Sequence, residues 1–161
     1  GVFSISRLDV KSARTKTLEK SAVMSWIVTP EPHAPEISEA KLHEAIAAAL
    51  VDSKDVEERL ISRAAAYASI PAIPVPDPEV EVFTDAATDA TVIEVRSHDR
   101  PGLLFRIGAA ITQSKIDIRS AIVTTLGAEA IDTLYVTELS GGPLSSERAA
   151  EVASHLKQAL K

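Results

Sequence analysis

The second half of the chain contains three segments with the pattern of β-strands. In Ile116–Ser120 apolar and polar side chains alternate with a period of two, and Ile131–Leu139 is rich in β-branched and aromatic residues. Between them, Leu126–Glu129 has the composition of a tight turn, in which Gly127 permits a positive φ angle. A further short strand is predicted at Thr91–Arg96.

Two amphipathic helices are predicted to flank this hairpin. One begins near Pro101, where the missing N–H is harmless, and the other follows Ser145, a suitable N-cap residue. Their apolar residues recur at helical spacing: Leu103, Ile107, Ala110 and Ile111 in the first, and Ala149, Val152, Leu156 and Leu160 in the second. From Thr91 the order is strand, helix, strand, strand, helix, which is five of the six elements of a ferredoxin-like βαββαβ unit.

The hairpin is present twice in the chain. Leu8–Thr29 aligns with Ile116–Thr137 without gaps at an offset of 108 residues, and eight of the 22 aligned positions are identical. Ordinary composition gives about one or two identities by chance, so we interpret the pair as a duplication. Glu19 stands at the position of Gly127, and the first turn must therefore differ from the second or carry strain.

The remaining segments complete a prediction of two α+β modules in tandem. Residues 38–68 are predicted to be helical with a break near Asp52, with Leu42, Ile46 and Leu50 on one face. Glu79–Phe83 is predicted to be the last strand of the first module, and the proline clusters at residues 30–35 and 71–78 are predicted loops. The predicted boundaries are 1–83 for the first module, 84–90 for a connector and 91–161 for the second.

Both predicted modules are incomplete. The first module lacks its first strand and the start of its first helix, and the second lacks a clear last strand. Because the first strand of this fold lies inside the sheet, we expect the first module to be unstable unless another strand fills the gap.

Composition narrows the functional classes. The 17 Lys and Arg residues against 23 Asp and Glu residues give a net charge of −6, which disfavours binding to nucleic acid. The chain has no cysteine, which removes disulfides and thiolate metal sites, and it has no apolar run long enough to cross a membrane. It begins at Gly1 without a leader pattern, so we expect a cytoplasmic piece of a longer protein.

The loop after the Thr91–Arg96 strand carries the candidate chemistry. Its residues Asp99, Arg100, Pro101, Gly102 and Leu103 turn the chain into a helix. The free N–H groups at a helix start can hold a carboxylate, and Asp99 beside them can accept a hydrogen bond from an ammonium group. A zwitterionic amino acid presents both charges. The alternative is that Asp99 only caps the helix and Gly102 only turns the chain.

Other chemistries are weaker candidates. His98 and Asp99 resemble a metal-binding His-Asp pair, but the other histidines do not supply further ligands at suitable spacing, so we expect no metal site. The chain also lacks the Gly-Ser turn and paired aspartates of a nucleotidyltransferase, so we expect it to be non-catalytic. Aromatic residues make up 4% of the chain, which disfavours an RNA-binding surface.

The segments VIEVRSHDRPGLLFRIGAAI and IDIRSAIVTTLGAEAIDTLYVTEL resemble ACT domains. These are small ferredoxin-like modules that regulate metabolic enzymes by binding amino acids. The resemblance implies a ligand site at Asp99–Leu103 and at the position that opens the second strand, which is Asp117 here and Asp9 in the first copy. Relatives that bind serine often have Asn at that position, and a carboxylate cannot donate a hydrogen bond as an amide can.

The tandem pair, together with GVFSISRLDVKSA and WIVTPE, resembles the carboxy-terminal end of the PII-protein uridylyltransferase/uridylyl-removing enzyme family. The resemblance implies a region that senses glutamine or another small amino acid, with the PII signalling protein as partner of the longer enzyme and magnesium as cofactor of its catalytic domains. It also implies ACT–ACT pairing or a homo-oligomer. The alternative is a dimerisation or protein-interaction module that binds no small molecule.

Overall fold

The computed structural model describes residues 1–19, 21–68 and 75–161, so the loop predicted at residues 71–78 lies outside the described residues up to residue 74. The elements in chain order are α1 (Val2–Ile5), β1 (Leu8–Leu18), β2 (Ser21–Pro30), α2 (Glu39–Val51), α3 (Lys54–Ala68), β3 (Glu79–Phe83), β4 (Thr91–His98), α4 (Leu103–Gln113), β5 (Ile116–Leu126), β6 (Glu129–Glu138) and α5 (Ser146–Ala159).

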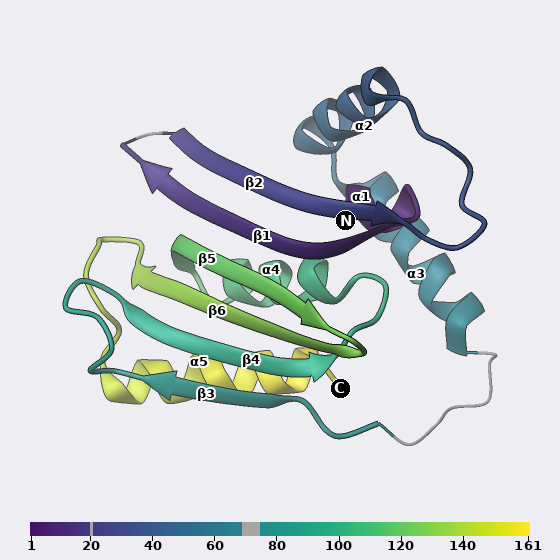
Figure 1. Cartoon of the computed structure of the whole chain (residues 1–161). Coiled ribbons are helices and arrows are strands. Elements are labelled where there is room, and N and C mark those ends of the chain that lie inside the picture. Colours follow the sequence, from purple (N-terminus) through teal and green to yellow (C-terminus); the bar gives the residue numbers. More distant parts are fainter. Residues whose placement is uncertain (20, 69–74) are drawn as a thin grey trace.

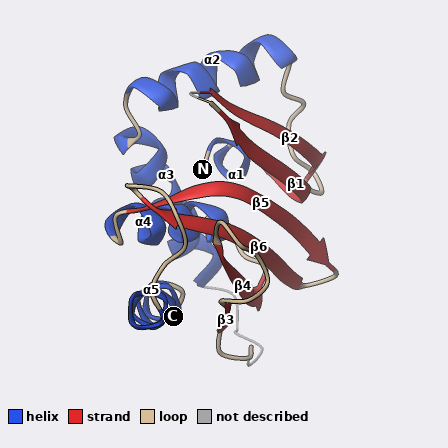
Figure 2. Ribbon diagram, turned by 90° about the vertical axis from the view of Figure 1, so that its left-hand side faces the viewer, coloured by secondary structure: helices blue, strands red, loops and turns tan. Residues whose placement is uncertain are grey.

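The strands form one sheet in the order β2-β1-β5-β6-β4-β3, and every neighbouring pair is antiparallel (Figure 1). The helices α4 and α5 lie on the same face of this sheet, and among the described elements no helix covers the opposite face (Figure 2). This arrangement confirms the predicted α+β class, with ferredoxin-like units, antiparallel strands and helices on one face.

The duplication is visible in the strand register. Each copy has a register shift at the equivalent place, between Val10 and Ser12 in β1 and between Ile118 and Ser120 in β5. A β-bulge inserts one residue into a strand and is a feature that a fold retains. The matching irregularities show that the two hairpins are copies of one structural unit.

The two copies pair with each other through β1 and β5. Arg14 lies opposite Ile122, its own equivalent at the offset of 108 residues, so a local two-fold axis passes between them. Two hydroxyl groups obey this symmetry: Thr17 Oγ1 donates to the carbonyl of Ile118 at 3.4 Å, and Thr125 Oγ1 donates to the carbonyl of Val10 at 3.0 Å. The tandem modules therefore share one continuous sheet.

The strand β3 lies at the far edge of that sheet, paired with β4. The sequence predicts that Glu79–Phe83 closes the first module, whereas in the structure it pairs with β4 and occupies the place of the last strand of the second module. Val80 and Val82 pack against the core beneath α4 and α5, which gives this pairing its apolar contact. A local pattern shows that a strand exists, whereas its partner depends on the three-dimensional arrangement.

The main core lies between the second half of the sheet and its helices. Ile93, Val136 and Leu156 are fully buried there. By contrast, β2 has no buried residue, and α2 has none either. On the apolar face predicted for α2, Leu42 and Ile46 are partly buried, whereas Leu50 is 85% exposed. The predicted break between helices at Asp52 is confirmed, because α2 ends at Val51 and α3 begins at Lys54.

Candidate functional site: a pocket between the two copies

The loop between β4 and α4 is fixed by hydrogen bonds to two other parts of the second copy. The backbone N–H of Asp99 donates to the carbonyl of Ala128 at 2.8 Å, and the Arg100 guanidinium donates to the carbonyl of Leu160 at the end of α5. Gly102 has a φ of +83°, a left-handed conformation that glycine adopts without the steric cost of a Cβ atom. The loop therefore presents its residues in a fixed arrangement.

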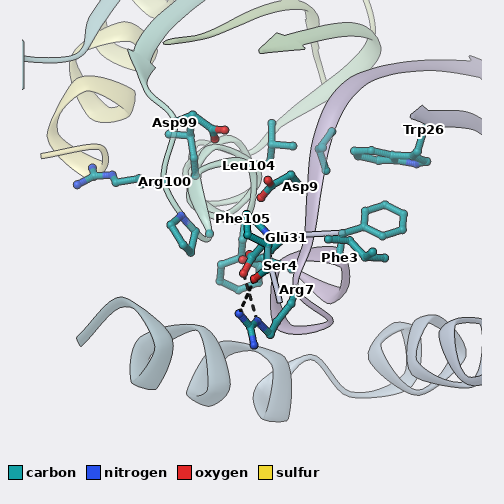
Figure 3. A pocket seen from close by; sticks show the side chains of 17 residues that line it. Phe3, Ser4, Arg7, Asp9, Trp26, Glu31, Asp99, Arg100, Leu104 and Phe105 are labelled. Carbon is teal, nitrogen blue, oxygen red and sulfur yellow. Dashed lines mark hydrogen bonds and ion pairs between the residues drawn. The ribbon is translucent and has the colours of Figure 1, made fainter. Parts of the chain in front are cut away.

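A pocket of about 480 Å³ opens beside this loop (Figure 3). One wall consists of Asp99–Gly102 and the first residues of α4. The other wall comes from the first part of the chain, namely α1, the start of β1, Trp26 and the segment that follows β2. The pocket therefore lies between the two copies of the repeat.

Two carboxylates face the pocket from opposite walls, Asp9 on β1 and Asp99 in the loop (Figure 3). The pKa of Asp99 is raised, first by partial burial and then by the negative charge of Asp9, while Lys11 and His98 act in the opposite direction. Lys11 Nζ lies 3.7 Å from Asp9 Oδ2. A cationic group placed between the two carboxylates would relieve their repulsion.

The N-terminus of α4 lies at the same wall as Asp99 and carries a partial positive charge. Its N-cap residue is Gly102, and no side chain caps the helix. The alternative that Asp99 serves as the helix cap is therefore wrong. The first N–H groups of a helix have no intrahelical acceptor and carry a partial positive charge, which favours an anion such as a carboxylate. In α4 the N–H of Leu103 already donates to the carbonyl of Arg100 at 3.1 Å, so an anion would bind to the later N–H groups of the first turn.

An ion-pair cluster links the far wall of the pocket to α3. The Arg7 Nε lies 3.3 Å from Glu31 Oε2 (Figure 3). The Arg63 guanidinium of α3 pairs with the other carboxylate oxygen of Glu31. A Cβ atom on Gly102 would lie 3.6 Å from Cδ2 of Leu60, which is also on α3. The helix α3 thus contacts both walls.

The structure places the predicted site residues in two groups. Asp99, Arg100, Pro101, Gly102 and Leu103 all line the pocket. Asp117 is not among the lining residues, and its equivalent Asp9 is in its place. The reason is the antiparallel pairing of β1 with β5, which runs from Ser12 opposite Thr124 to Lys16 opposite Ser120 and so sets the starts of the two strands at opposite ends. That these residues bind a ligand stays a prediction.

Sequence reasoning missed the aromatic and charged residues of the far wall. Phe3 and Trp26 have ring centroids 5.1 Å apart, and both line the pocket. Trp26 is 36% exposed although its equivalent Leu134 is 3% exposed in the core. The signal available in the sequence was a large aromatic residue, Trp26, at a position where the other copy has a leucine.

His98, the residue considered for a metal site, is not among the residues that line the pocket. His98 is the last residue of β4, and within residues 1–19, 21–68 and 75–161 no group of three His, Cys, Asp or Glu side chains could hold a metal ion. Over the same residues, none of the helices has the length and apolar character that a membrane span requires.

Comparison with known proteins shows one matching domain family and several similar enzymes. The ACT domain model matches residues 91–154. The bifunctional uridylyltransferase/uridylyl-removing enzyme of Streptomyces coelicolor is 38% identical over 168 aligned residues, covering 100% of this chain. Enzymes of the same name from Erythrobacter litoralis and Novosphingobium aromaticivorans are 34% and 32% identical over 81% and 86% of the chain.

The chain spans only 20%, 14% and 16% of the lengths of these three relatives. The alignment with the Streptomyces enzyme covers the first copy as well as the second, although the ACT model matches only the second. Residues 91–154 of the chain therefore match the ACT domain family, and over its whole length the chain is similar to one part of a bifunctional uridylyltransferase/uridylyl-removing enzyme.

Proposed function

We propose that this region senses a small amino acid, with glutamine as the first candidate, and that the pocket between the two copies is the sensing site. The observation that carries the proposal is the meeting of the Asp99–Leu103 loop with Asp9 of the other copy across one cavity. A zwitterion needs a partner for each of its two charges. The two carboxylates suit its ammonium group, and the start of α4, which no side chain caps, suits its carboxylate.

The ligand's two charged groups have separate partners in this proposal. Its ammonium group lies between Asp9 and Asp99, which accept its hydrogen bonds. Its carboxylate lies at the start of α4, where the backbone N–H groups of the first turn donate. The side chain then extends toward Phe3, Trp26 and the exposed part of Arg7. A hydrogen bond that involves a charged group contributes about 1.5–3 kcal/mol, so each of these partners matters to affinity.

In this proposal the region is part of a longer enzyme, whose other domains carry out the catalysis. The region itself is regulatory and non-catalytic, and the amino acid shifts the balance between adding uridylyl groups to the PII protein and removing them. Magnesium belongs to catalytic domains outside this chain, and the enzyme acts in the cytoplasm. The names of the relatives support the two activities, and the ACT family supports the regulatory role.

Calorimetry of the chain with glutamine, glutamate and serine tests the proposal. We expect a binding heat with at least one of them, and a ligand at 100 times its Kd should stabilise the fold by about 2.7 kcal/mol in thermal unfolding. If none of the three produces heat or a shift in unfolding, this region does not sense these amino acids.

The variant Gly102→Leu tests the position of the site. A leucine there strains the left-handed backbone and fills the loop wall, so we expect glutamine affinity to fall at least tenfold. Gly141→Leu is the matched control, because Gly141 has a similar φ of +90° and open space around it, away from the pocket. Unchanged affinity in Gly102→Leu would place the ligand elsewhere.

A protein-interaction role is the second candidate, because β2 is an edge strand of the described sheet. Its side chains Val23, Met24 and Ile27 are 55%, 56% and 62% exposed, and an open edge can pair with another chain. This role also covers homo-oligomers formed through ACT–ACT pairing. Light scattering with and without glutamine separates the candidates: an oligomer that ignores the amino acid, together with no binding heat, favours interaction alone.

A further inference from the structure

One face of the six-stranded sheet is not covered by helices. The helices α4 and α5 pack on the face that carries Ile93, Val95 and Leu134, and no described helix lies on the opposite face (Figure 2). Residues directly opposite each other in neighbouring strands share a face, so the register identifies the side chains of the uncovered face. They form three rows, each with one residue from every strand, and we call these rows the open face. The first row is Ile27, Ser12, Thr124, Ile131, Arg96 and Glu79, the second is Ser25, Arg14, Ile122, Thr133, Glu94 and Glu81, and the third is Val23, Lys16, Ser120, Tyr135, Val92 and Phe83.

The open face is more apolar than a sheet face that only meets water, which in antiparallel sheets is commonly polar. In its third row Tyr135, Val92 and Phe83 are consecutive neighbours. In the second row Ile122 lies diagonally opposite both Tyr135 and Ile131, at a separation that long side chains bridge. Ile122 and Phe83 are 40% and 41% exposed. These five residues form one apolar patch across β5, β6, β4 and β3, and a contiguous exposed patch of this kind marks an interaction surface.

The charges of the open face are balanced in number but separated in space. The face carries three cations and three acids, although the chain as a whole has a net charge of −6. On β1 the charged members are the exposed cations Arg14 and Lys16, whereas on β3 they are the exposed acids Glu79 and Glu81. On β4 the two charges pair with each other, with Arg96 Nε 2.8 Å from Glu94 Oε1. The β1 side of the face is therefore positive and the β3 side negative.

This charge separation makes the open face complementary to itself in one orientation. Sheets that pack face to face keep their strands roughly aligned, so a two-fold axis between two such faces runs either across or along the strands. An axis across the strands places β1 over β1 and β3 over β3 of the other chain, and like charges meet. An axis along the strands reverses the strand order, so β2 lies over β3, β1 over β4 and β5 over β6. The cations of β1 then lie among the acids of β3 and β4, and the apolar patches of the two chains meet at the centre.

We propose that the open face binds the open face of a second chain, in a two-fold dimer whose axis runs along the strands. This dimer does not rest on the proposed function, because none of the residues that line the pocket belongs to the open face. It also differs from pairing at the edge of β2, since it uses the face of the sheet and not its backbone edge. Three rows across six strands come close to the roughly 20–30 residues that each partner contributes to a standard interface. The mixture of apolar and charged contacts corresponds to a Kd of about 1–100 μM.

Analytical ultracentrifugation of the full chain tests the dimer. We expect a monomer–dimer equilibrium in the wild type, with dimers predominating at about 300 μM. Ile122→Glu places a charge at the centre of the apolar patch and should raise the dimer Kd about tenfold or more, because the carboxylate would have to leave water. Ile122 is 40% exposed, so the change is compatible with the folded sheet, and circular dichroism verifies the fold. A wild type that stays monomeric at this concentration overturns the proposal.

Met24→Glu is the matched control for the face. Met24 is an exposed apolar strand residue, 56% exposed, and it lies on the other face of the sheet because its neighbours Val23 and Ser25 belong to the open face. Its dimer Kd should stay within about twofold of the wild type. If Met24→Glu weakens the dimer as much as Ile122→Glu does, the chains associate through another surface, such as the edge of β2, and the proposal is wrong.

A charge exchange tests the direction of the axis. Arg14→Glu and Glu81→Lys should each weaken self-association about tenfold or more, because each brings like charges together twice in the dimer. An equimolar mixture of the two variants should form a heterodimer, since opposite charges then meet at both ends, and native mass spectrometry distinguishes its mass. Arg59→Glu, the same change at an exposed position of α3, should associate like the wild type. A mixture that forms no heterodimer overturns the proposed orientation, whereas glutamine calorimetry decides the proposed function separately.

Discussion

Glu19 and Gly127 occupy the same position in the two hairpin turns, and both have a positive φ, +53° and +64° respectively. The alignment of the repeat predicted this conflict, because the turn of the second copy uses a glycine where the first has a side chain. A left-handed conformation costs an ordinary L-residue about 1–2 kcal/mol, and the duplicated turn imposes that cost on Glu19.

Glu19→Gly should therefore stabilise the chain by up to about 1 kcal/mol, since the relief of strain exceeds the extra chain entropy that glycine loses on folding. Urea unfolding measures the difference. The reverse substitution in the second turn, Gly127→Ala, is the matched control and should destabilise by about 1 kcal/mol. A loss of stability in Glu19→Gly would mean that the Glu19 side chain contributes more than its backbone costs.

At the scale of elements, the short strand β3 changes the extent of the second module. It precedes the connector at residues 84–90 in sequence, yet it pairs with β4 along its whole length, from Glu79 opposite Arg96 to Phe83 opposite Val92. Without it, β4 would become an edge strand, and Val80 and Val82 would no longer cover the core. The smallest stable unit should then begin before Glu79.

A fragment of residues 77–161 should be more stable than one of residues 91–161, the predicted extent of the second module. Two half-buried valines and the ladder to β4 account for about 2–3 kcal/mol of the difference. Thermal unfolding followed by circular dichroism compares the fragments. Equal melting temperatures would show that β3 adds nothing to the module and would favour the boundary at residue 91.

Local signals predicted the elements well, because their causes are local. Ser38 and Ser145 cap α2 and α5 by accepting from the N–H groups of Lys41 and Arg148. The partner of β3 could not be predicted, since strand pairing joins residues that are distant in sequence. The candidate site also depends on long-range pairing. The loop at Asp99 could be identified from its composition, but whether Asp9 or Asp117 lies beside it in the pocket depends on how β1 pairs with β5.

At the scale of the whole molecule, the pocket depends on both copies. The loop comes from the second copy, and the strand end that faces it comes from the first. The antiparallel pairing of β1 with β5 therefore does more than extend the sheet, because it determines which of two equivalent aspartates reaches the loop. Neither copy contains the pocket by itself.

A matched pair of variants tests this dependence. Asp9→Asn should weaken glutamine binding at least tenfold, because it removes a charge-assisted hydrogen bond worth about 1.5–3 kcal/mol. Asp117→Asn makes the same chemical change at the equivalent position, outside the pocket, and should change the affinity less than twofold. Calorimetry measures both. The opposite result would mean that the ligand lies at the other end of β5, as the resemblance alone implied.

The axis between Arg14 and Ile122 has a consequence for the history of the chain. In a dimer of identical subunits, a residue on the two-fold axis meets only its own copy, so its partner is always of the same kind. Here a cation faces an aliphatic side chain, a combination that no such dimer could contain. Once two copies are joined in one polypeptide, each side of the junction can mutate alone, and one half is free to specialise while the other supports it.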